Sequence, residues 1–295
     1  MEIRKVPASA GAEWLLGAFG LLRKSPLGLG LLGLIYAGLS LIVVLTAQSV
    51  PALGGALQLV FLFIGPLLLA GMIFAAHEVD EGRKPLPGHL LAAIRNGKAW
   101  RVITTLAPQI VLALVCLALL YVIVGQANIE RLMEFSVKLQ AQAQAQAQGK
   151  IDPDFMAEMM RELPMSRLGL WFIAVAAIAF GAIFFTLTIV PDIMFSDVRL
   201  VAAMRRSYRA CTQNFLALLV FLLLGFVVMM AYGLGLGILG GLAGLIGGDV
   251  AMLLLNTIGN GVFVVFIAGA MYFAWKQMLG GGDSAPTAAP TGIAL

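Results

Sequence analysis

Six long apolar runs without Lys, Arg, Asp or Glu constrain this chain most strongly. Each is about 20 residues long, enough to cross roughly 30 Å of hydrocarbon as a helix. Hydrophobic residues make up 61% of the chain and charged residues only 12%, about half the share in soluble domains. We therefore predict an all-α integral membrane protein with six transmembrane helices in a single domain, residues 1–279. The predicted spans are 27–47, 56–76, 102–124, 168–190, 215–236 and 250–275.

Short amphipathic segments precede spans 1, 3 and 5. The stretch 12–36 predicts an amphipathic helix, a basic turn at Arg23 and the start of span 1. Similar helices are predicted at 89–98 and 197–209, and Ser9 is expected to cap the first of the three. Apolar residues at helical spacing on one face are typical of a helix that lies in the membrane interface. Those faces hold Trp14, Leu15, Ala18, Phe19 and Leu22; Leu90, Leu91 and Ile94; and Val198, Val201, Met204 and Tyr208.

The remaining segments connect or extend the spans. Residues 126–167 form a polar insertion, predicted as a helix over 128–148 that frays or becomes disordered toward Gly149, and a short helix over 152–164. The link 49–55 is short and uncharged, and Pro191 is predicted to end span 4. A glycine-dense link, 237–248, joins spans 5 and 6, with a re-entrant segment as the alternative. The tail 280–295 is expected to be disordered.

The distribution of basic residues predicts the orientation. With both termini in the cytoplasm, 14 of the 19 Lys and Arg residues lie on the cytoplasmic side, as the positive-inside rule requires. The chain then forms three in-out hairpins. The first apolar run begins only at Leu27 and exceeds the 7–15 residues of a signal-peptide core, so we expect it to remain as an anchor.

An internal repeat accounts for the spacing of the basic turns. Arg23, Arg95 and Arg209 take equivalent places once the insertion is removed. The hairpin ends also match, because 72–78 resembles 271–277 and, more weakly, 193–197. The alternative is that any three hairpins with basic turns look alike.

Basic residues on the cytoplasmic side are candidates for contacts with lipid headgroups or a protein partner. They are Arg23, Lys24, Arg83, Arg95, Arg206 and Arg209. The densest polar cluster, 77–85, would hold a metal only together with His89, and we favour a solvated loop whose charges pair with one another. No metal or cofactor is predicted, and the net charge of +4 is explained by orientation rather than by nucleic-acid binding.

Polar residues within the spans are few. Gln109, Asn256 and Asn260 are candidates for intramembrane polar contacts, and the absence of charge near the middle of any span disfavours ion pumps. No Ser/His/Asp set has a recognisable spacing, so no catalytic residue is predicted. Four methionines at 156–165 suit a packing surface better than a copper site.

Glycine patterns point to helix packing. The two G-x-G-x-x-G runs, at 28–33 and 235–240, lie in apolar sequence without the strand that a dinucleotide site needs. Glycines four residues apart at 233–248 permit close helix approach, within the chain or between subunits.

Several motifs carry a family resemblance. They are Val6-Pro7-Ala8 with Trp14 and 22–26, the run 78–85, and the basic turn 207–215. Together they resemble an uncharacterised proteobacterial family of multi-pass inner-membrane proteins. The layout is similar to the membrane domain attached to some glycerophosphodiester phosphodiesterases, but no phosphodiesterase domain is present. The resemblance omits the insertion and the tail, and it implies no activity and no site residues.

Two functional hypotheses follow. The first is a non-enzymatic protein with a structural or interaction role in envelope or lipid organisation. The alternative is a transporter or channel for an apolar or lipid-like solute. We expect membrane lipids as partners, with a second copy or another membrane protein as further candidates. A membrane enzyme is the least favoured interpretation.

Overall fold

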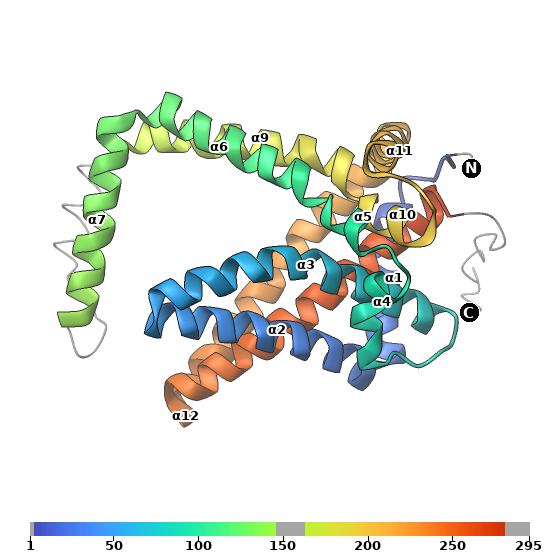
Figure 1. Cartoon of the computed structure of the whole chain (residues 1–295), viewed down its shortest axis with the longest axis horizontal. Helices are drawn as coiled ribbons and strands as arrows, with labels where there is room; N and C mark the ends of the chain where they lie inside the picture. Colours follow the sequence, from blue (N-terminus) through green and yellow to red (C-terminus); the bar gives the residue numbers. More distant parts are fainter. Residues whose placement is uncertain (1–2, 146–162, 281–295) are drawn as a thin grey trace, which may run out of the picture. The chain divides into compact units, whose positions relative to one another are not determined.

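The computed structural model describes residues 3–145 and 163–280, and these residues form helices and turns without a strand. The helices (Figure 1) are α1 (Ala10–Lys24), α2 (Pro26–Ser49), α3 (Pro51–Asp80), η1 (Pro87–Leu91), α4 (Ala92–Arg95), α5 (Ala99–Ile103), α6 (Leu106–Val124), α7 (Gln126–Ala145), α9 (Met165–Thr186), α10 (Ile189–Phe195), α11 (Leu200–Gln213) and α12 (Phe215–Met278). Five helical segments are long and apolar enough to cross a membrane. The predicted class, an all-α membrane protein, is therefore confirmed.

The last of these segments, α12, consists of two helical halves. Its 64 residues are interrupted at Gly248, where φ is 64° and ψ is −160°. Such a positive φ is open to glycine at little cost. The halves pack against each other, since the rings of Tyr232 and Phe263 stack with centroids 5.4 Å apart. The predicted link 237–248 is thus wrong in part, because residues 237–247 continue the first helical half.

Residues up to Leu106 and from Phe184 onward form one compact unit, unit 1. Its core is built from α2, α3 and the two halves of α12, with α1 packed against α12. An added Cβ on Gly33 of α2 would collide with the backbone of Gly261 in α12, and one on Gly11 of α1 would collide with Ala217. Glycine at these crossings lets the helices approach closely. Within the run 28–33, Gly33 therefore serves helix packing.

The glycines at 233, 237, 241 and 244 behave differently. A Cβ added at any of them meets open space, and Gly240 alone in this series faces neighbouring side chains, those of Asn256 and Met252. Within this chain, these glycines therefore do not serve close helix packing, except at Gly240. Packing against a second subunit stays a prediction.

Residues 107–183 form a second unit, unit 2. It holds most of α6, the helix α7 and most of α9. The Trp171 indole N–H donates to the Cys116 carbonyl at 3.1 Å, and Arg167 donates to the last carbonyl of α6 at 3.4 Å. Helix α7 confirms the predicted helix in the insertion as far as Ala145. The rest of the Gln/Ala tract, the predicted helix at 152–164, Met156, Met159 and Met160, and the tail from 281 lie outside the described residues.

Two spans break earlier than predicted. Span 3 is divided at Thr104 and Thr105, ahead of Pro108, and span 4 is divided at Leu187 and Thr188, ahead of Pro191. Proline lacks the N–H that bonds to the carbonyl four residues upstream, and its ring clashes there, so a helix breaks before the proline. Pro191 therefore lies inside α10 and does not end the span.

Three smaller expectations also change. Helix α1 begins after Ser9, but the Ser9 side chain makes no capping hydrogen bond. The predicted helix 89–98 is a 3₁₀ turn followed by α4, ended at Gly97 with φ of 67°. The link 49–55 shrinks to Val50, because α3 starts at Pro51. The last two changes divide a helix and shorten a loop, and none of the three alters the helical class.

Candidate functional site at the charged end of unit 1

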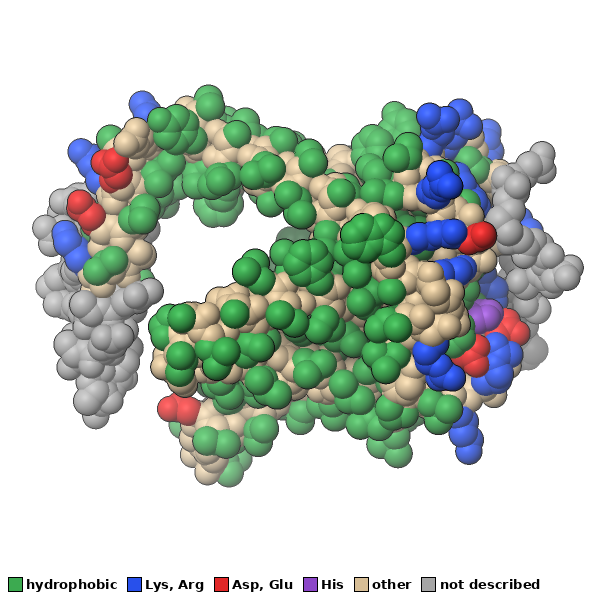
Figure 2. All heavy atoms as spheres, viewed as in Figure 1, with side chains coloured by type: hydrophobic (Ala, Val, Ile, Leu, Met, Phe, Trp, Pro, Cys, Tyr) green, Lys and Arg blue, Asp and Glu red, His purple; other side chains and the backbone are tan. Residues whose placement is uncertain are grey.

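Lys and Arg side chains gather at one end of unit 1, and the flanks leading away from it carry hydrophobic side chains (Figure 2). Between residues 27 and 76 there is no charged residue, and between 215 and 275 Asp249 alone is charged. Because Asp249 follows the break at Gly248, it lies at the opposite tip of the α12 hairpin. The short helices α1, α4, α5, α10 and α11 surround the charged end.

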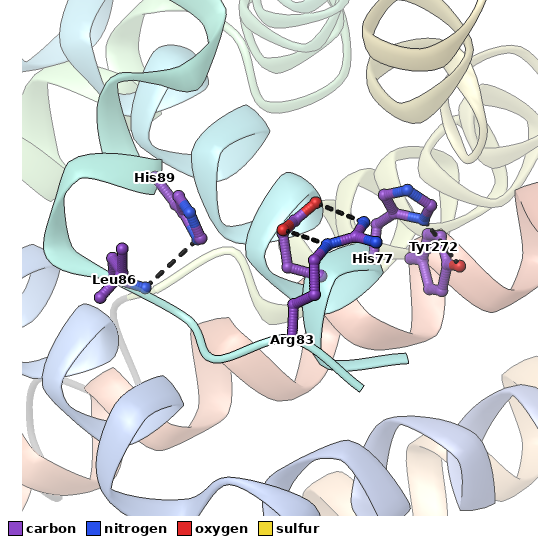
Figure 3. A network of polar contacts seen from close by, with 6 residues as sticks. His77, Arg83, Leu86, His89 and Tyr272 are labelled. Carbon is purple, nitrogen blue, oxygen red and sulfur yellow. Dashed lines mark hydrogen bonds and ion pairs between the residues drawn. The ribbon is translucent and has the colours of Figure 1, made fainter. Parts of the chain in front are cut away.

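The first polar network at this end joins α3 to the end of α12. The Tyr272 hydroxyl donates to Asp80 at 2.9 Å, and the Lys276 ammonium lies 2.5 Å from the same carboxylate oxygen. On the other side, His77 Nδ1 is 3.2 Å from the Tyr272 hydroxyl (Figure 3). Tyr272 is buried and the other three residues are partly buried. Such charge-assisted bonds fix the two helix ends against each other.

The second network is built on Asp192 of α10, whose side chain is fully buried. Its Oδ1 accepts from the Trp275 indole at 3.1 Å and from Ser196 at 3.1 Å, and lies 3.2 Å from the Arg206 guanidinium. Three helices therefore meet at one carboxylate: α10, α11 and α12. A buried charge demands such pairing, because leaving it bare is costly.

Phe195 connects the two networks. Its ring lies 5.0 Å from that of His77 and 4.7 Å from that of Trp275, measured between centroids. The matched segments 72–78, 193–197 and 271–277 thus contribute to the same cluster. This juxtaposition agrees with the predicted repeat, which itself stays a prediction.

The N-terminal residues are tied into the same end. The Arg4 N–H donates to the Met278 carbonyl at 3.0 Å, and the Val6 N–H donates to the Asn214 side chain at 2.8 Å. Asn214 separates α11 from α12, and its amide donates to the Arg4 carbonyl at 2.9 Å. The start of the chain is therefore fastened to the end of α12 and to the turn before it.

The predicted basic residues divide into two groups. Arg83 forms a two-pronged pair with Glu78, at 2.6 and 2.7 Å (Figure 3), and Arg206 pairs with Asp192. The others are exposed, with no carboxylate partner among residues 3–145 and 163–280. These exposed residues are Arg23, Lys24, Arg95 and Arg209.

The histidines of the cluster 77–85 and its neighbourhood are engaged in hydrogen bonds. The Leu86 N–H donates to His89 Nδ1 at 3.2 Å, and His77 faces Tyr272 (Figure 3). Within the part of the chain that the structure describes, no group of three His, Cys, Asp or Glu side chains is arranged to hold a metal ion. The favoured interpretation, a self-paired loop, fits the Glu78–Arg83 pair.

The predicted intramembrane polar residues are divided between the two units. Asn256 and Asn260 lie one turn apart on the second half of α12, and Gln109 belongs to unit 2. The Asn256 amide donates to the Met252 carbonyl of its own helix at 2.9 Å. Its donor is thus satisfied without a ligand.

Lys98 and Cys211 are among the titratable groups that burial perturbs at this end. Desolvation lowers the pKa of Lys98, whose ammonium donates to the Met194 carbonyl at 2.8 Å. Burial raises the pKa of the Cys211 thiol to about 12. Cys211 thus holds its proton at neutral pH and is inaccessible, which makes a reactive thiol role incompatible with this site.

Sequence reasoning missed Asp192, Trp275 and Asn214. An acid directly after a proline at the end of an apolar run was a signal for Asp192, but the sequence does not show that the chain continues as a buried helix.

Comparison with known proteins found no match: no protein-family model, no curated protein and no solved structure corresponds to this chain.

Proposed function

We propose that this chain is a non-enzymatic protein of the bacterial inner membrane that organises the envelope or its lipids. It crosses the membrane six times as three in-out hairpins with both termini in the cytoplasm. The two halves of α12 supply the fifth and sixth spans, and the resemblance of its cytoplasmic motifs to a proteobacterial multi-pass family fits this placement.

The observation that carries this proposal is the contrast between uncharged spans and a cross-linked charged end. Asp80 and Asp192 hold the last turns of α12 to α3 and α10. These carboxylates pair with Lys276 and Arg206 of the same chain. This internal pairing favours a fixed scaffold over a catalytic centre. The exposed basic residues then remain for partners on the cytoplasmic face.

Transport of an apolar or lipid-like solute is the second candidate. The helix breaks before Pro108 and Pro191 favour it, since broken helices recur in transporters. The self-bonded Asn256 disfavours it.

A deletion strain tests the proposal. Its phospholipid composition is compared with that of the parent strain and of strains complemented with the intact chain or with an Arg23→Gln/Arg95→Gln/Arg209→Gln variant. Affinity purification of the tagged chain is run in parallel. We expect the deletion to alter the phospholipid composition and the intact chain, but not the variant, to restore it. Alternatively, we expect the tagged chain to purify with a stable membrane partner. Unchanged lipids and no partner, together with reduced uptake of an apolar solute, would support transport instead.

A further inference from the structure

The short helices of the charged end carry bulky apolar side chains on their outer faces. On α1, Leu16, Phe19 and Arg23 follow one another at helical spacing, and Phe19 is 55% exposed. The opposite face of α1 is buried, with Trp14 and Ala18 packed against α12. Helix α1 therefore presents an apolar face with an arginine at its end to its surroundings.

The segment of α4 and α5 repeats this arrangement. Leu91 and Ile94 are exposed, and Trp100 is 74% exposed. The small residues Ala92 and Ala93 are buried instead. Arg95 lies directly beside Ile94, so a cation again adjoins exposed apolar surface.

Helix α11 is the third instance. Val201 is 70% exposed and Tyr208 is exposed, while Ala203, Ser207 and Cys211 are buried. Arg209 stands beside Tyr208 on the outer face. The second and third segments bury small residues and turn large apolar residues outward, as helices do in contact with lipid. Helix α1 also exposes Leu16 and Phe19, but it buries Trp14.

The charge balance of this outer surface is one-sided. Arg83, Arg101, Arg206 and Lys276 each form an ion pair within unit 1. Arg23, Arg95 and Arg209 have no carboxylate within the described residues. An apolar side chain next to an uncompensated cation matches the boundary between acyl chains and anionic headgroups.

We propose that Arg23, Arg95 and Arg209 each bind the phosphate-bearing headgroup of an anionic phospholipid in the surrounding bilayer. The acyl chains of these lipids lie against Phe19, Trp100 and Val201. This inference rests on the proposed function only in placing the chain in a membrane. Each basic residue near an anionic surface contributes about a fivefold preference over a zwitterionic lipid.

Trp100 reports directly on one of these sites. The full chain, with Trp171→Phe to remove the tryptophan of unit 2, is reconstituted into vesicles of phosphatidylcholine. The buried Trp14 and Trp275 also emit, and a matched chain with Trp100→Phe measures their emission so that it can be subtracted. Lipids with brominated acyl chains, either phosphatidylglycerol or phosphatidylcholine, are then titrated in. We expect brominated phosphatidylglycerol to quench the Trp100 emission at about one fifth of the mole fraction that brominated phosphatidylcholine requires.

Matched variants assign the preference to Arg95. Arg95→Gln should bring the ratio of the two quenching mole fractions, phosphatidylcholine to phosphatidylglycerol, down to about one. Arg95→Lys should retain most of the preference for phosphatidylglycerol. Arg83→Gln should leave that preference unchanged, because Arg83 is paired with Glu78. Size-exclusion chromatography verifies folding. As a second measurement, native mass spectrometry counts phosphatidylglycerol bound to Arg23→Gln and Arg209→Gln, and each should hold fewer lipids.

Three results would overturn the inference. Equal quenching by both lipids in the parent chain contradicts headgroup selection, and a preference that survives Arg95→Gln contradicts the assigned site. Absence of quenching by either lipid places Trp100 away from the acyl chains and contradicts the site as well, whereas the deletion strain tests the proposed function independently. Failure of the inference and failure of the proposed function are therefore distinguishable.

Discussion

Arg206 and Arg209 lie one turn apart on α11 but in opposite environments. The Arg206 side chain is 22% exposed and pairs with the fully buried Asp192. Arg209 is exposed and has no carboxylate partner among the described residues. At the charged end, buried and partly buried charges hold helices together, whereas exposed basic residues are available to partners. Residue type alone therefore does not define a role here, because the neighbours that the fold supplies decide it.

The largest effect that separates the two faces concerns Cys211, on the inner side of α11. With a pKa of about 12, its thiolate is about a thousandfold scarcer than that of an ordinary thiol. In a chain with Cys116→Ala, which leaves Cys211 as its one cysteine, a maleimide should not label Cys211 at pH 8 in the folded protein and should label it after denaturation. Rapid labelling of the folded chain would place Cys211 on the outer face.

The raised pKa of Cys211 also makes the unfolding free energy depend on pH. The contribution of the buried thiol is fully present below about pH 9 and is lost as the pH rises toward 12.

Removal of the Asp192 carboxylate is the second strongest perturbation. Asp192→Ala removes the carboxylate that Arg206, Trp275 and Ser196 share, which should cost about 3 kcal/mol of unfolding free energy. The matched control is Asp197→Ala, because the Asp197 side chain is 82% exposed and its pair with Arg101 should contribute under about 1 kcal/mol. Denaturant unfolding in detergent measures both. Equal losses would remove the distinction between inner and outer pairs.

Two glycines of α2 extend the comparison to the spans. Gly33→Ala forces a Cβ into the backbone of Gly261 and should destabilise unit 1 by about 1–3 kcal/mol. Gly30 faces open space, so Gly30→Ala should be neutral or stabilising by up to about 1 kcal/mol. Thermal unfolding in detergent compares the pair. A stable Gly33→Ala protein would contradict the close α2–α12 crossing.

The smallest stability effect is expected on the outer face. Arg209→Gln should change the unfolding free energy by less than about 0.5 kcal/mol, as do most surface substitutions. Arg206→Gln, its inner counterpart, should cost several times more because Asp192 would remain buried and charged. The same unfolding assay ranks the two variants, and a larger loss for Arg209→Gln would reverse the assignment.

The all-helical membrane class could be predicted from the sequence because lipid demands long uncharged helices. The packing of the short helices could be predicted only in part. Val201 and Ile94 are exposed, as expected for faces that lie in the membrane interface, but Leu90 and Trp14, which were grouped on such faces too, are buried. In water such a face marks the core, whereas beside lipid it marks the outside. Periodicity alone carries no information on the surrounding solvent.

The polar networks were beyond sequence reasoning for a different reason. Asp80 and Lys276 are 196 positions apart, and their pairing depends on how the hairpins meet. Likewise, span 4 was predicted to end at Pro191, but the helix breaks on the upstream side, where the carbonyl loses its partner. The residues that fasten the charged end thus emerge only from the assembled fold.

Accessibility from the two sides of the membrane tests the central claim most directly. In a chain carrying Cys116→Ala and Cys211→Ala, a single cysteine is placed at the charged end (Gln213→Cys) or at the opposite end of unit 1 (Ser49→Cys), both exposed positions. A membrane-impermeant maleimide is applied to intact spheroplasts and after lysis. With the charged end in the cytoplasm, we expect Ser49→Cys to be labelled in intact spheroplasts and Gln213→Cys to be labelled only after lysis. Labelling of Gln213→Cys before lysis would contradict it.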